Sequence, residues 1–263
     1  MSFETSAENY TVGKGQVFFN RKQDNGTFEG WRNLGNVVSL STSVEIEKLD
    51  HYTTRSKYRN KDKSVIVEVN PKLSMTLDEI NAENFAFLFL ADVQEVDQAA
   101  SLTDETKTIA SAQIKPGYAI DLGAKFIDAT SFKITDNGTA KTFVAGVDYL
   151  LNPASGLVHI YQNGAIDGKE DITATYKLEA RKYKTLANFQ RSSIEGEFRY
   201  VSDNAAGSNM EIVFWSVSFS PTGDTALLTD GAEWMQIELE GEIQGDNAGH
   251  PASPFGILTM VER

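Results

Sequence analysis

The stretch that decides the fold runs from Trp31 to Leu90 and holds two alternating runs, 38-VSLSTSVEI-46 and 65-VIVEVNPKLSMTL-77. In the first run the even positions are apolar or threonine, and in the second most odd positions are apolar. A period of two over such lengths predicts two strands that each bury one face. The polar, charged span at 50–64 between them is too hydrophilic for a core. The sequence therefore predicts one long β-hairpin with a charged loop.

A short apolar helix is predicted over residues 81–90, directly after the second strand. Asn81 is the predicted N-cap, since its side chain can accept from a free N–H of the first turn. Phe85, Leu88 and Phe89 share one helical face. We expect that face to be buried against the hairpin.

The character of the sequence changes at residues 98–186. This segment holds short alternating runs separated by turn signals such as Asp136-Asn-Gly138. It carries ten Lys or Arg and ten Asp or Glu, whereas residues 187–263 carry 3 against 12. The sequence therefore predicts a small all-β module at 98–186, inserted into a core domain made of residues 1–97 and 187–263.

Composition excludes several classes of function. The 263 residues include no cysteine, which removes disulfides, thiolate zinc sites and cysteine nucleophiles and fits folding in a reducing cytoplasm. The first residues, MSFETS, lack the basic and apolar regions of a signal peptide, and no apolar run is long enough to span a membrane. The net charge of −13 disfavours tight binding to a phosphate backbone.

Residues that could carry catalysis or metal binding are scattered. His51, His159 and His250 are far apart in the sequence and show no metal-ligand spacing. Asp167-Gly-Lys-Glu-Asp171 lacks the ligand pattern of a calcium loop. Glu195 and Glu197 point the same way on a strand but lack a partner base or pocket. We therefore expect no metal, no cofactor and no enzymatic activity.

Five cations occupy every second position in the charged loop. They are Arg55, Lys57, Arg59, Lys61 and Lys63. In an extended loop all five would project from one side. They could form a solvated face, or bind acidic surface on the next copy of the chain, a heterologous contact that propagates. Nucleic-acid binding is the weaker reading, because only Tyr52 and Tyr58 could stack on bases.

A second row of like charges lies near the C-terminus. Glu238, Glu240 and Glu242 alternate with apolar residues, among them Ile237 and Leu239. The pattern predicts a strand with a buried apolar face and an acidic outer face.

In their order and spacing, several motifs resemble those of phage tail tube proteins. They are Gly30-Trp-Arg-Asn-Leu-Gly-Asn36, the alternating strands with their charged loop, Leu77-Asp-Glu79, Glu83-Asn84 before the helix, and Pro254-Phe-Gly256. The resemblance covers residues 1–97 and 187–263. It implies a β-sandwich or half-barrel tube fold packed by one helix, with the long hairpin reaching a neighbouring ring.

The resemblance also implies a function. The chain would be a structural virion protein that forms stacked hexameric rings, the tail tube through which phage DNA passes without specific binding. Its partners would be further copies, the tape measure protein and other tail proteins. It would be located in the virion tail after assembly in the host cytoplasm. The glutamates of 238–242 would line an acidic lumen, and the 98–186 module would project outward.

The main alternative comes from a different class. The chain could be a carbohydrate-binding or adhesin-like β-protein whose inserted module is the binder. A tube protein would form large rings or filaments, whereas a lectin would stay small and be retained on a glycan resin.

Overall fold

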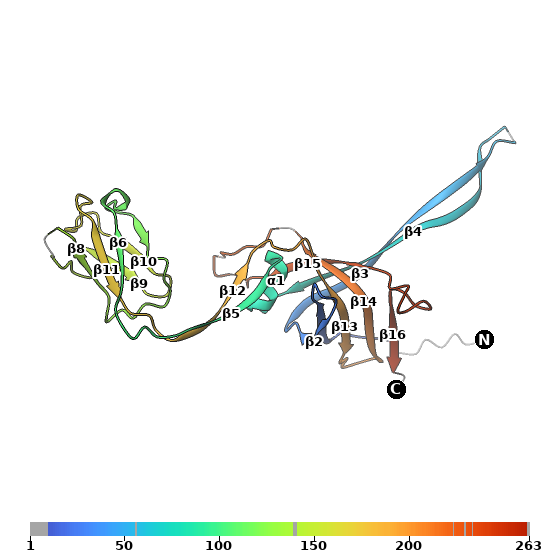
Figure 1. The fold of residues 1–263 in the computed structure, drawn as a ribbon. Coiled ribbons are helices and arrows are strands. Elements are labelled where there is room, and N and C mark those ends of the chain that lie inside the picture. Colours follow the sequence, from blue (N-terminus) through green and yellow to red (C-terminus); the bar gives the residue numbers. More distant parts are fainter. Residues whose placement is uncertain are drawn as a thin grey trace. The chain divides into compact units, whose positions relative to one another are not determined.

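The structure is a computed structural model that describes residues 10–261 except 56, 139–140, 223, 229 and 233. The protein is mainly β, with several antiparallel sheets and one α-helix in the described part of the chain (Figure 1). It divides into two compact units, Met1–Gln94 with Leu186–Arg263, and Glu95–Thr185. These boundaries lie within three residues of the 97/98 and 186/187 limits expected from the sequence.

Unit 1 is built on an eight-stranded antiparallel sheet. Its order is β2-β1-β13-β14-β15-β4-β3, and β16 pairs with β14 beside this path. The strands are β1 (Gly15–Lys22), β2 (Phe28–Asn33), β3 (Val37–Thr53), β4 (Asn60–Leu77), β13 (Ile194–Ser202), β14 (Asn209–Pro221), β15 (Ile237–Ile243) and β16 (Gly256–Val261). The chain therefore returns after unit 2 to complete the sheet begun before it.

The core of unit 1 lies on one face of this sheet. Three rings meet edge to face at its centre, with the Phe19 centroid 5.3 Å from that of Phe87 and 5.4 Å from that of Phe219. Leu73, Met75 and Leu77 of β4 belong to the same buried cluster, as the alternation predicts. Such aromatic geometry adds to the free energy gained by burying the area alone.

Helix α1 (Ala82–Phe89) begins as predicted, because the side chain of Asn81 accepts from the Asn84 backbone N–H at 2.8 Å. The expected buried face is wrong. Phe85, Leu88 and Phe89 are only half-buried, whereas Phe87 is 3% exposed. The helix packs on β14 and β15, and its Phe87 belongs to the same buried cluster as Leu73, Met75 and Leu77 of β4.

A buried asparagine explains why the helix turns Phe87 toward the core and leaves the predicted face half-buried. Asn84 is fully buried and lies on the face of Phe87, three residues on. Its Nδ2 donates to the carbonyl oxygens of Leu34 at 2.9 Å and Glu79 at 2.8 Å, and its Oδ1 accepts from Arg32 at 2.9 Å. Because the buried side of the helix includes the polar Asn84, the apolar pattern of the sequence predicted a different buried face.

The long hairpin is present and longer than predicted. Strands β3 and β4 pair from Val37 with Leu77 to Thr53 with Asn60, so most of the expected loop at 50–64 is strand. The expectation that each strand buries one face holds for β4 only at Leu73, Met75 and Leu77. It is wrong for β3, which has no fully buried side chain and in which Val38 is 53% exposed. From Pro71 toward the tip, the side chains of β4 are also largely exposed.

Unit 2 is an all-β module with its own core. One three-stranded sheet has the order β7-β10-β9 and the other β6-β11-β8. The strands are β6 (Glu105–Ile109), β7 (Ala119–Asp121), β8 (Lys133–Asp136), β9 (Tyr149–Asn152), β10 (Leu157–Ile160) and β11 (Ile172–Tyr176), with a 3-10 turn at Ser111–Gln113. Ile134, Val158 and Ile160 are among its fully buried side chains.

The chain passes between the two units in β5 (Asp92–Gln98) and β12 (Arg181–Ala187). These two segments form a two-stranded sheet of their own.

Candidate assembly surfaces

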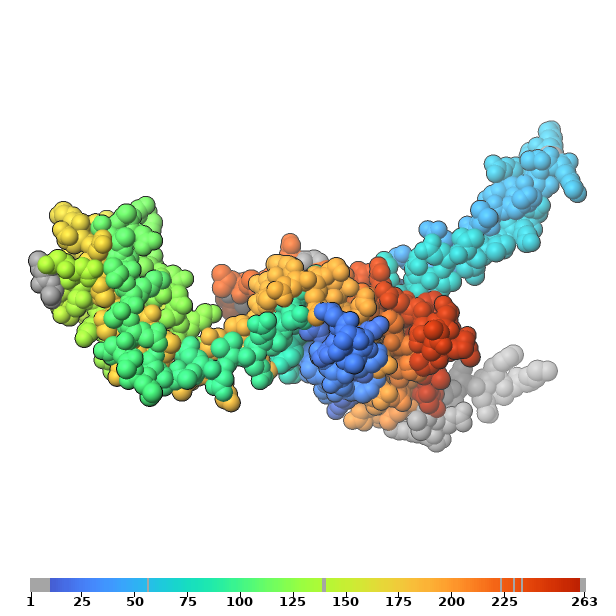
Figure 2. Space-filling model, viewed as in Figure 1, coloured from blue at the N-terminus to red at the C-terminus, as the bar shows by residue number. Residues whose placement is uncertain are grey.

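The shaft of the hairpin, residues 44–53 of β3 and 60–71 of β4, carries apolar side chains that the chain itself does not cover. Among the described residues, the pairing of β4 with β15 ends at Lys72, and the rest of β4 pairs with β3. Val44, Ile46 and Val69 share one face there and are 57%, 47% and 40% exposed. Figures 1 and 2 show this projection in blue and cyan. Contiguous exposed apolar surface of this kind marks interaction sites.

Two irregularities change which face each residue of β4 occupies. The register slips between Glu47 and Lys48 and again between His51 and Tyr52, each time by one extra residue in β4. Past the first slip, Leu49 and Val65 stand opposite each other on the other face, and both are exposed. The distal shaft is therefore apolar on both sides.

The five cations do not form the one-sided row predicted from their spacing. Arg55, Lys57 and Arg59 lie in the turn between the strands. Lys61 stands opposite Tyr52 and Lys63 opposite His51. His51 and Tyr52 are consecutive in β3 and point to opposite faces, so the lysines opposite them also point to opposite faces. The hairpin therefore ends in a basic tip, formed by these five cations, with positive charge in the turn and on both faces of the strands.

Some of this positive charge is already balanced inside the hairpin. The Lys61 ammonium lies 2.7 Å from the Asp50 carboxylate, and this hydrogen bond lowers the pKa of Asp50. The Arg59 guanidinium lies 4.6 Å from the ring centroid of Tyr52. Arg55 and Lys57 are exposed at the turn, and the Lys57 ammonium lies 5.9 Å from the ring centroid of Tyr58.

The predicted acidic strand is β15. Its apolar residues are buried and its three glutamates lie on the opposite face, with Glu238 and Glu242 exposed and Glu240 half-buried. The cross-strand neighbours on that face are the hydroxyl residues Ser74, Thr76, Ser218 and Ser220 and, opposite Glu242, Lys72. The face is therefore polar and acidic.

Lys72 is the cation that stands within this acidic face. Its ammonium lies 3.3 Å from Glu240 and 3.5 Å from Glu45. The hydrogen bond to Glu240, followed by the charge of Glu45, raises the pKa of Lys72.

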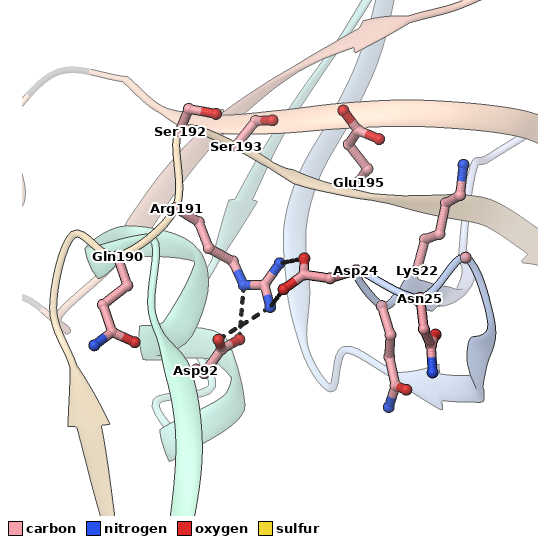
Figure 3. Close-up of a pocket in the computed structure, with 11 residues that line it drawn as sticks. Lys22, Asp24, Asn25, Asp92, Gln190, Arg191, Ser192, Ser193 and Glu195 are labelled. Atoms are coloured by element: carbon pink, nitrogen blue, oxygen red, sulfur yellow. Dashed lines mark hydrogen bonds and ion pairs between the residues drawn. The ribbon is translucent and has the colours of Figure 1, made fainter.

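A cluster of ion pairs in unit 1, here called the ionic clamp, joins the first residue of β5 to the segment that follows β12 (Figure 3). The Arg191 guanidinium binds Asp92 at 2.8 and 3.0 Å and Asp24 at 2.5 and 3.1 Å. Arg21 adds a contact to Asp92 at 2.6 Å. Arg191 hydrogen bonding is the largest cause of the lowered pKa of Asp92. The clamp ties the start of β5 and the segment after β12 to the β1–β2 turn.

The pocket around this clamp has a volume of about 930 Å³ and is lined by polar side chains, among them Lys22, Gln190 and Ser193. Arg191 is already bound to two carboxylates, so it does not offer a free charge to a ligand. Its geometry suits a structural anchor. No local pattern predicts the clamp, because its residues come from three distant segments, Arg21 with Asp24, Asp92, and Arg191.

The three histidines lie in separate surroundings. His51 contacts Asp62 at 2.5 Å, His159 packs against Tyr161, and His250 stacks on Trp215 with Nδ1 2.9 Å from Asp246. In the described ranges, His, Asp and Glu side chains form no group of three that could hold a metal ion.

Sequence reasoning missed the β14–β15 connection, residues 222–236. Leu228 is 93% exposed and Trp234 is 87% exposed, both on irregular backbone. A tryptophan and two leucines between turn residues were the available signal.

Comparison with known proteins assigns the family. A family model described as "protein of unknown function UCP028589" matches residues 10–258, and the chain belongs to this family. No curated protein matches the chain. Within the described residues, no helix has the length and apolar character needed to cross a membrane.

Proposed function

We propose that this protein is a structural subunit that assembles with copies of itself into stacked hexameric rings, the tail tube of a phage. The observation that carries the proposal is the hairpin shaft, whose apolar side chains face solvent on both sides. Leaving such side chains in water costs roughly 25 cal/mol per Å². A second copy that covers the shaft recovers this free energy.

The acidic face of β15 supports the same proposal. The carboxylates repel the phosphate groups of DNA, and the short hydroxyl side chains provide no aromatic surface on which its bases could stack. A wall of this kind lets DNA slide past without holding it, which is the property a conduit needs. In the proposed tube this face is directed to the lumen.

Further parts of the proposal concern partners and location. The subunit acts in the virion tail, after assembly in the host cytoplasm, beside a tape measure protein and other tail proteins. Unit 2 projects outward from the tube wall. The chain performs no catalysis and binds no cofactor.

The test compares the full chain with a variant in which residues 46–69 are replaced by Asn-Gly. Glu45 and Asn70 are directly paired, so a two-residue turn closes the shortened hairpin. The shaft contributes little to the core, so the variant should fold normally by circular dichroism. Sedimentation velocity should show large assemblies for the full chain and small species for the variant.

Equal sedimentation of the two proteins would overturn the proposal. A full chain that stays small and is retained on a glycan resin would favour the carbohydrate-binding alternative.

A further inference from the structure

Three large apolar side chains of the β14–β15 connection face solvent. Leu227, Leu228 and Trp234 are 60%, 93% and 87% exposed. Asp224 and Asp230 are also exposed, and residues 222–236 include no Lys or Arg. The connection is therefore an acidic loop with large apolar side chains turned to solvent.

This loop and the hairpin leave the sheet at opposite ends. Ile237, which follows the loop, pairs with Leu77, and the pairing of β15 with β4 then runs to Glu242 and Lys72. The hairpin shaft continues from Lys72 away from the loop. One strand pair therefore carries the loop at one end and the hairpin at the other.

The hairpin is long enough to reach a second copy. From Ser43 to Thr53 it extends ten residues beyond its last contact with the main sheet, about 33 Å at 3.3 Å per residue. Copies shifted along the strand direction bring the tip of one toward the loop of the next. A contact between two different patches can repeat from copy to copy, and it builds an open stack when no rotation closes it into a ring.

The two surfaces match in chemistry. The tip offers exposed cations, Arg55 and Lys57, beside exposed apolar residues, Leu49 and Tyr58. The loop offers exposed carboxylates beside exposed leucine and tryptophan side chains. Opposite charges steer the encounter and fix its register, while the apolar side chains supply the buried area.

The other acidic surfaces of unit 1 fit the tip less well. The β15 face has carboxylates among short hydroxyls and lacks large apolar side chains. On the shaft, Glu45 already binds Lys72, and the exposed acids Glu47 and Glu68 share this surface with exposed cations such as Lys48 and Lys63. The loop joins exposed carboxylates to large exposed apolar side chains and includes no Lys or Arg.

We propose that the β14–β15 connection of one copy receives the basic tip of the β3–β4 hairpin of a second copy. This contact rests on the proposed self-assembly and names the surfaces that make it. Trp234 becomes buried on docking, and the acids of the loop pair with the cations of the tip.

Charge reversal on each side tests the contact. The tip variant is Arg55→Glu with Lys57→Glu, the loop variant is Asp224→Lys with Asp230→Lys, and a third protein carries all four changes. Glu29→Lys with Asp203→Lys is the matched control, because both acids are exposed elsewhere on unit 1. Sedimentation velocity and Trp234 emission are measured on each protein, with Trp234→Phe identifying the contribution of that residue.

We expect the tip and loop variants to lose fast-sedimenting material, the control to keep it, and the fourfold variant to regain it. Trp234 emission should shift to shorter wavelength only in proteins that assemble. A fourfold variant that stays small, or tip and loop variants that assemble like the control, would overturn the contact while leaving self-assembly intact. An unaltered chain that stays small at every concentration would overturn both.

Discussion

Replacement of Phe87 by alanine tests how the helix anchors unit 1. The Phe87 ring fills the centre of the core, with its centroid 5.3 Å from that of Phe19 and 5.7 Å from that of Phe219. Truncation of a phenylalanine buried to this degree costs about 3–5 kcal/mol of unfolding free energy. The neighbouring rings belong to strands β1 and β14, so the cavity can collapse only by moving the sheet.

Phe89→Ala is the matched control, because it removes the same atoms from the same helix. Phe89 is half-buried and packs against Phe85 and Phe189, and Phe189 is itself exposed. Its truncation should cost about 1 kcal/mol, an ordinary value for a site outside the core.

Urea unfolding followed by tryptophan fluorescence measures both changes. The three tryptophans of the chain, Trp31, Trp215 and Trp234, all lie in unit 1. The shortened-hairpin background keeps association from shifting the midpoint. With a slope of about 2 kcal/mol per molar, Phe87→Ala should lower the midpoint by roughly 2 M and Phe89→Ala by about 0.5 M. Equal shifts would refute the assignment of Phe87 as the anchor.

Three further predictions follow from the same structure. Arg191→Met should destabilise unit 1 at pH 7. Because the pKa of Asp92 is lowered in the fold, the stabilisation from its ion pair is present above about pH 4 and is lost as the pH falls through the folded pKa. The urea midpoints of variant and parent should therefore converge in acid. Asn84→Leu should cost several kcal/mol, since the carbonyls and guanidinium it binds lose their partner, and a thermal midpoint within a degree of the parent would speak against this. Replacement of 95–185 by a Gly/Ser linker should leave assembly intact by electron microscopy, whereas a folded protein without rings would place unit 2 in the interface.

Local pattern was enough to predict the elements that carry the site. The alternation in β15 correctly put its glutamates on one face and Ile237, Leu239 and Ile243 in the core. Asn81 marked the start of the helix because capping depends on residues close in sequence. Short alternating runs, turn signals and a balanced charge set residues 98–186 apart from their flanks.

What the sequence could not predict depends on partners distant in the chain. Asn84 looks like a surface residue until Leu34 and Arg32 are placed beside it. The register slip between His51 and Tyr52 arises from strand pairing and puts Lys61 and Lys63 on opposite faces, while the other three cations lie in the turn. Spacing alone therefore predicted a one-sided basic row that does not form. Alternation of apolar and polar residues predicts that one face of a strand is buried, but it does not say whether the same chain or another copy buries it. Val44 and Ile46 were therefore expected to be buried, although they are exposed in the single chain.

Negative-stain electron microscopy of the purified full chain is the decisive test of assembly into a tube. We expect ring-shaped end views with six-fold symmetry and, at higher protein concentration, tubes with a continuous central channel. Uniform small particles without rings, at every salt and protein concentration examined, would contradict it.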